Sequence, residues 1–223
     1  FGVVLGKLFA NNEASSRAII TLTLLLVFVE IFNYKYKNEI TSDVNLDKYN
    51  YSNTKMNPLL VIILATFVVA IRALIGYAIP TSWNKETYQL ILLFFFMGIG
   101  KALGGILIDT IGIKITSILS TLVAVPLLIF GENIMIISIL GVMLFSMTMA
   151  ITLAIIISNL KKYPGIAFGC TTLGLFIGTF PIFVVTFNRL ISIILVISLS
   201  ILSFIILIMI SKENLTINKS SKK

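Results

Sequence analysis

One arginine is the residue most able to do chemistry, because it lies deep within an apolar run. Arg72 falls in VVAIRALIGYAIP, well inside the stretch that begins at Pro58. If that stretch crosses a bilayer, a charge there costs about 2.5–3.5 kcal/mol on insertion scales, so it must face a cavity or a partner. The partner could be protein outside this chain, backbone carbonyls or an anionic solute. The alternative is that Arg72 snorkels to the outer interface.

A second run, GKALGGILIDTIGIK, holds four glycines, one aspartate and two lysines. Gly100 and Gly104 have the spacing that lets two helices approach closely in lipid. Gly112 would allow a sharp turn between helices. Asp109 would lie at the water interface, where it can interact with a helix N-terminus. The plainer alternative is that Asp109 only caps a helix in a short loop.

Further candidates lie in later apolar stretches. Tyr77, Thr148, Thr152 and Thr171 could face a cavity, although a threonine in a membrane helix usually bonds its own backbone. The small-residue spacing recurs in one later stretch, at Gly165, Gly169, Gly174 and Gly178. That recurrence predicts close helix packing, either at a static interface or at one that moves.

Composition places these residues in a membrane protein. The 223-residue chain is 58% hydrophobic and 12% charged, too apolar for an ordinary soluble fold. The net charge of +8 comes from lysines spread over short loops and the tail, which argues against nucleic acid. There is no histidine and one cysteine, Cys170, and no phosphate loop or catalytic set occurs. We therefore expect no enzyme activity, no metal and no cofactor.

Seven stretches are apolar and long enough to predict transmembrane helices. They are about Ala14–Asn33, Pro58–Pro80, Tyr88–Ile108, Ile113–Phe130, Ile134–Ser158, Pro164–Phe187 and Ile191–Ile210. Asn57 is a predicted N-cap, with Pro58 at the first helical position. The predicted organisation is the end of one helical bundle over 1–33, a polar loop over 34–57, a six-helix bundle over 58–211 and a tail over 212–223.

The basic residues predict the orientation of these helices, because cytoplasmic loops are enriched in lysine and arginine. With the long loop and the C-terminus on the cytoplasmic side, only Arg17, Lys85 and Arg189 fall at outer connections. Twelve lysines then lie inside or at the inner interface: Lys35, Lys37, Lys48, Lys55, Lys101, Lys114, Lys161, Lys162, Lys212, Lys219, Lys222 and Lys223.

This topology and one loop motif resemble the major facilitator superfamily of transporters. Its loop signature has a glycine, an aspartate four residues later, a second glycine and basic residues. Gly105, Asp109, Gly112 and Lys114 fit it, whereas Thr110 and Ile113 stand where basic residues are usual. The resemblance implies that the chain is the C-terminal half of a twelve-helix protein, preceded by the last helix of the N-terminal half. It also implies a gating role for the Asp109 loop, thinned by the two departures.

The resemblance implies a secondary transporter that moves a small solute across the inner (plasma) membrane by alternating access. Its partners would be the lipid bilayer, the solute and the missing N-terminal bundle. Arg72, Tyr77, Thr148, Thr152 and Thr171 would be the candidates for solute or coupling contacts. Because the chain starts at Phe1, we expect it to be a fragment of a longer protein. The rivals are a non-transporting membrane subunit, an inactive transporter fragment and a membrane-embedded enzyme.

Overall fold

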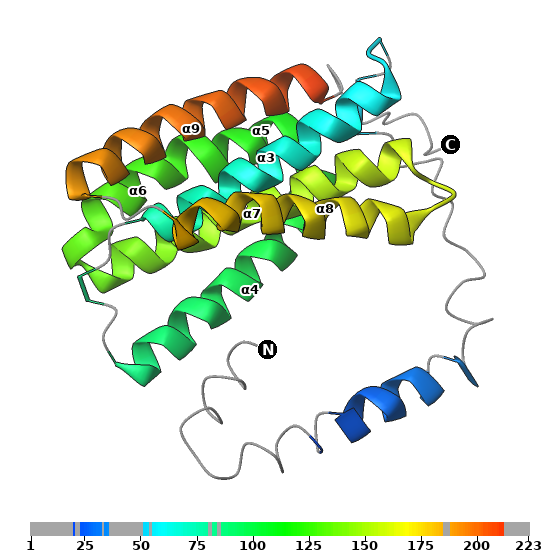
Figure 1. The fold of residues 1–223 in the computed structure, drawn as a ribbon, viewed down its shortest axis with the longest axis horizontal. Coiled ribbons are helices and arrows are strands. Elements are labelled where there is room, and N and C mark those ends of the chain that lie inside the picture. The colour runs from blue at the N-terminus through cyan, green and yellow to red at the C-terminus, as the bar shows by residue number, and fades with distance from the viewer. Residues whose placement is uncertain are drawn as a thin grey trace, which may run out of the picture.

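The computed structural model describes residues 20, 23–32, 34–35, 51–53, 55–79, 82–83, 86–184 and 188–211. Within these ranges the chain is helical, and its one β-type contact is an isolated bridge between Ser52 and Ser211. The helices beyond residue 57 form one bundle (Figure 1): α3 (Pro58–Ala78), α4 (Thr87–Thr110), α5 (Ile113–Ile118), α6 (Ala124–Phe130), α7 (Met135–Asn159), α8 (Pro164–Thr179) and α9 (Arg189–Ile210).

Five of the helical segments in the described residues are long and apolar enough to cross a membrane. They are Pro58–Ala78, Tyr88–Thr110, Ile113–Asn133, Met135–Asn159 and Arg189–Ile210. Two shorter apolar helices, Thr23–Phe32 and Pro164–Thr179, fall within the first and sixth predicted spans. The prediction of an all-α fold is confirmed for the described residues, and the five long apolar helices are compatible with a membrane-embedded protein. The count of seven spans and the facilitator type of the bundle stay predictions.

Local sequence explains where α3 and α8 begin and where α8 ends. The Asn57 side chain accepts a hydrogen bond from the Leu59 amide at 3.1 Å, so the predicted N-cap is confirmed. Proline occupies the first turn of both α3 and α8, where its missing N–H has no intrahelical partner to lose. Pro181 ends α8, and a 3₁₀ turn, η4 (Phe180–Phe183), follows. That early end makes α8 shorter than the predicted span.

The span between α4 and α7 is interrupted by a wider turn. It comprises α5, a π-helical turn η2 (Leu119–Val123), α6 and a 3₁₀ turn η3 (Gly131–Asn133). Pro126 lies within α6, lacks an amide hydrogen and crowds the carbonyl of the residue four positions earlier. That residue, Leu122, belongs to η2, so the π turn is the expected place for the helix to widen and take up the clash.

The bundle consists of two helix triplets with reciprocal contacts. The first is α3, α4 and the α5–α6 segment, and the second is α7, α8 and α9. Helix α4 packs on α7, and α8 packs on α3 in return. The α5–α6 segment packs on α7, α9 packs on α3, and α3 also contacts α7. Each triplet passes from one end of the bundle to the other three times. Because three is odd, the second triplet starts at the opposite end from the first and runs in the opposite sense, which is the arrangement of an inverted repeat.

Glycines make the closest of these reciprocal contacts. At each of four positions a side chain would collide with the first helix of the other triplet: Gly100 with Met143 and Gly104 with Met147 in one interface, Gly174 with Thr66 and Gly178 with Ala70 in the other. In each interface the two contacting helices run parallel to each other. Matching Thr66 with Met143, and Gly100 with Gly174, therefore superimposes one interface on the other. The four glycines therefore allow the close helix packing that the sequence predicts for them.

Replacing Gly100 by alanine should loosen the contact between α4 and α7. The new methyl group would meet the Met143 carbonyl oxygen, and backbone cannot rotate away as a side chain can. We expect a loss of about 1–3 kcal/mol, as for other overpacked sites. Gly98→Ala is the matched control, because it lies on the same helix beside open space. Thermal unfolding of both variants in one detergent measures the difference. A Gly100→Ala protein as stable as the control would contradict this account.

Candidate functional site

Arg72 lies in the interior of the bundle, and no carboxylate of the described residues forms an ion pair with it. The residue is 8% exposed, and its guanidinium carbon lies 5.9 Å from the centre of the Phe145 ring on α7. This distance allows a cation–π contact. Its Nε is enclosed and has no hydrogen-bond acceptor in the described part of the chain. The sequence predicts a buried cation that needs a partner, and the ring is the partner that these residues provide.

Lys101 is a further candidate site residue, which the sequence analysis did not single out. It lies between Gly100 and Gly104, whose contacts with Met143 and Met147 bring it to the level of Phe145. It is partly buried, and it is close enough to Arg72 for the two positive charges to repel each other. The sequence predicts Lys101 inside or at the inner interface, and in the structure it lies more than two turns before the end of α4 at Thr110. Its depth within the Tyr88–Thr110 span is the signal that could have found it.

The predicted cavity threonines are buried inside the bundle. Thr148, Thr152 and Thr171 are each 0% exposed. Each hydroxyl donates to a backbone carbonyl of its own helix, for example Thr148 to Phe145 at 2.7 Å and Thr171 to Phe168 at 2.7 Å. Tyr77, in contrast, is 64% exposed near the end of α3. Contact between any of these residues and a solute stays a prediction.

The loop with the facilitator-like motif turns as expected. Gly112 has φ of +91°, which only glycine adopts without strain, and it lies between α4 and α5. Asp109, in the last turn of α4, accepts a hydrogen bond from the Tyr51 hydroxyl. Gly105 lies beside open space, and Lys114 is partly buried in the first turn of α5. The turn is confirmed, whereas the gating role of Asp109 stays a prediction.

Residues 51–53 form a clasp across this end of the bundle. The Tyr51 amide donates to Ser158 Oγ at 3.1 Å, and the Asn53 amide donates to the Ile210 carbonyl at 2.9 Å. The Asn53 side chain adds a hydrogen bond to the Met209 carbonyl at 3.1 Å. The clasp therefore joins the ends of α4, α7 and α9. These three residues fall in the predicted 34–57 loop, but they are held against the helices.

The opposite end of the bundle is joined by a different set of contacts. Arg189, at the start of α9, forms an ion pair of 2.6 Å with Glu132 in η3. Ser82 donates to the Glu132 carbonyl at 2.9 Å and to Asn133 Oδ1 at 2.7 Å. The connection between α3 and α4 is thus tied to the turn between the two triplets. Each end of the bundle has its own polar links.

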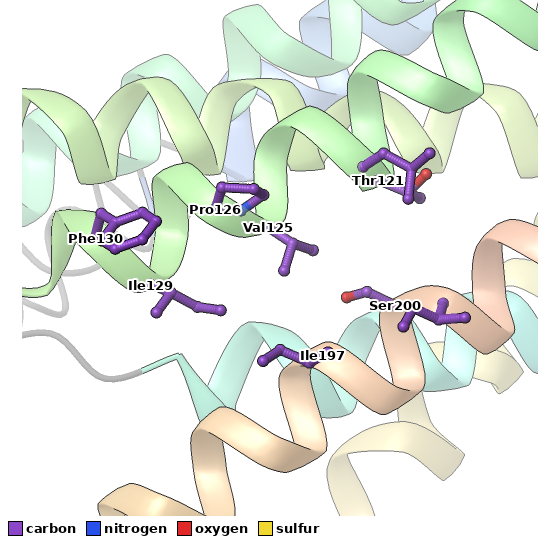
Figure 2. A pocket seen from close by; sticks show the side chains of 9 residues that line it. Thr121, Val125, Pro126, Ile129, Phe130, Ile197 and Ser200 are labelled. Atoms are coloured by element: carbon purple, nitrogen blue, oxygen red, sulfur yellow. The ribbon is translucent and has the colours of Figure 1, made fainter.

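Two glycines and one cavity lie apart from the buried cations. Gly165 and Gly169 lie beside open space, so the described bundle leaves their predicted packing surface uncovered. A cavity of about 390 Å³ lies between the η2–α6 region and α9. Figure 2 shows Thr121 and Ser200 bordering it among apolar side chains such as Ile129 and Ile197. Its lining suits hydrocarbon and carries no charge.

No known protein family, curated protein or solved structure matches the chain. The described residues also contain no group of three or more histidine, cysteine, aspartate or glutamate side chains that could hold a metal ion. The function must therefore be argued from the bundle and its buried charges.

Removing the Tyr51 hydroxyl should weaken the clasp. A hydrogen bond to a charged group is worth roughly 1.5–3 kcal/mol, and water screens the exposed Asp109, so we expect Tyr51→Phe to lower stability by about 1.5 kcal/mol at most. Asp109→Asn should be milder, since its amide oxygen still accepts from Tyr51. Tyr163→Phe is a control at an exposed tyrosine near the same end. Thermal unfolding in detergent compares the three, and equal melting temperatures for Tyr51→Phe and Tyr163→Phe would refute a stabilising clasp.

Proposed function

We propose that this chain is part of a secondary transporter that moves a small solute across a membrane by alternating access. The reciprocal packing of two helix triplets supports the proposal. Many secondary transporters are built from inverted repeats, with the solute site near the middle of the membrane at the repeat interface. The contacts between α3 and α7, and the glycine interfaces beside them, have this pattern.

The observation that carries the proposal is the buried charge of Arg72. Unpaired charges are rarely kept within a membrane bundle unless they serve a substrate or ion path, because each one costs several kcal/mol. Arg72 lies on α3 beside α7, where the two triplets meet. A position between the repeats is where a transported solute is expected to bind.

The finer assignments belong to the same proposal. The chain resembles the C-terminal half of a major facilitator superfamily transporter, with the missing N-terminal bundle as its partner. The Tyr51–Asn53 clasp and the Gly112 turn would face the cytoplasm, together with the C-terminus, and the membrane would be the inner (plasma) membrane. The Arg189–Glu132 pair would then lie at the outer face. The lysine distribution supports this orientation without Lys101, because the other inner lysines still outnumber the three outer basic residues.

A second candidate function is a polytopic membrane subunit that does not transport, or a transporter fragment without activity. Both fit the same helices and the same glycine interfaces. Neither requires an unpaired arginine at the meeting point of the triplets. Loss of Arg72 would therefore leave such a protein's function unchanged, which separates the two candidates.

Transport should depend on Arg72. The test uses vesicles that contain the protein in the form in which the cell makes it. We expect these vesicles to accumulate at least one solute from a defined mixture of isotopically labelled small molecules. Mass spectrometry of the vesicle contents measures the uptake. Arg72→Gln should reduce the initial rate at least tenfold, because the amide keeps hydrogen bonding but loses the charge. Gly98→Ala controls for expression and folding. Uptake that survives Arg72→Gln at full rate, or folded wild-type protein that moves no solute, would contradict the proposal.

A further inference from the structure

Two positive charges lie near the middle of the bundle and act on each other. Arg72 on α3 lies beside Phe145, and the backbone of Lys101 on α4 lies between two glycines that contact Met143 and Met147 of α7. Side chains on a helix lean toward its N-terminus. The Tyr51 clasp and Asp109 show that the N-terminal end of α3 and the C-terminal end of α4 lie at the same end of the bundle. Arg72 therefore leans toward the clasp end of the bundle, and Lys101 leans toward the opposite end.

No carboxylate in the described residues neutralises this pair. Asp109 lies in the last turn of α4 and accepts from Tyr51, and Glu132 lies in η3 and pairs with Arg189. Glu86 is the N-cap of α4, and Glu30 belongs to the separate helix Thr23–Phe32. Asp109, Glu86 and Glu132 lie toward the ends of the bundle, away from the level of Phe145. Two cations in a medium of low dielectric repel strongly, so the arrangement favours a bound negative charge.

The guanidinium of Arg72 has the donor set of an anion-binding group. Its central carbon lies 5.9 Å from the centre of the Phe145 ring, and its N–H bonds lie in the guanidinium plane. That plane carries the paired donors that match the oxygens of a phosphate or carboxylate. The Nε donor still lacks an acceptor, and an enclosed charged donor without a partner costs more than the roughly 1–3 kcal/mol of a neutral one. An oxyanion would satisfy it.

The fold does not need either cation. The superposition of the two glycine interfaces matches Arg72 with Met149 and Lys101 with Leu175. The second triplet therefore has apolar side chains at both matched positions. The second triplet packs without a charge at either position. Packing of the first triplet therefore does not require Arg72 or Lys101.

We propose that Arg72 and Lys101 together bind a small oxyanion with about two negative charges, of the chemistry of hydrogen phosphate or sulfate. Two cations and a dianion form a neutral cluster, which leaves no uncompensated charge at the site. The dianion comes from the aqueous phase, because the site lies at the middle of the helices and far from the level of lipid headgroups. Its identification as the transported solute rests on the proposed function, whereas its binding does not.

Equilibrium binding tests the site on the full protein in nanodiscs. The probes are sodium phosphate and sodium sulfate, with sodium chloride at equal ionic strength as the reference. Thermal unfolding and calorimetric titration measure binding. We expect saturable stabilisation by phosphate or sulfate that chloride does not give. The test variants are Arg72→Met and Lys101→Leu, which introduce the residues of the second triplet, and each should weaken binding at least tenfold. Lys101→Arg keeps the charge and should retain binding.

The controls separate binding from folding and from lipid. Without added oxyanion, Arg72→Met should unfold at or above the wild-type temperature, since it removes an unsatisfied buried charge. Lys162→Gln removes an exposed lysine and should bind phosphate like the wild type. Adding anionic lipid should not replace phosphate at the site. If it abolishes the phosphate effect, the oxyanion comes from a headgroup and the aqueous source is refuted.

Two outcomes would overturn the inference. One is wild-type protein that neither phosphate nor sulfate stabilises beyond chloride. The other is unchanged phosphate affinity in Arg72→Met or, should that variant fail to fold, in Lys101→Leu. Either result leaves the transport proposal standing if vesicles still accumulate another solute. Intact oxyanion binding without any uptake would instead overturn the transport proposal alone.

Discussion

Helices in a bilayer gain little from burying apolar side chains, because lipid chains are as apolar as leucine. Association then depends on close van der Waals contact, and the closest contact is between backbones. Glycines in α4 and α8 provide that contact in this bundle, where even a methyl group would collide with the neighbouring helix. The positions of α4 and α8 set the level of every side chain that they carry. The geometry around Phe145 therefore depends on these glycines.

Proline and the wider turns have effects that reach beyond one helix. Pro181 shortens α8, and the π turn before Pro126 accompanies the change of course between α5 and α6. The third members of the triplets, α5–α6 and α9, lie beside the apolar cavity rather than beside the cations. Irregular backbone is thus concentrated at the edge of the bundle, whereas the helices around Arg72 are continuous α-helices.

Local chemistry in the sequence predicts much of this structure. The cap at Asn57 and the turn at Gly112 follow from single residues, and both are confirmed. Lys101 was missed because a lysine near a loop motif resembles an interfacial residue. The depth of Lys101 in the bundle depends on which residues of α4 face α7. The clasp of Tyr51 was missed because its partners lie up to 107 positions away along the chain. Pairings of that range come from packing, which hydropathy does not encode.

The two triplets share a scaffold but differ in charge. An inverted repeat gives each triplet the same opportunity to place a residue against the central helices, and the second triplet has methionine and leucine where the first has arginine and lysine. Stability alone favours the apolar choice, because a buried unpaired cation is a cost that methionine does not have. An asymmetry that works against stability needs a cause outside folding. The proposed recognition of a negative charge at the meeting point of the triplets would supply such a cause, and it would use both cations at once.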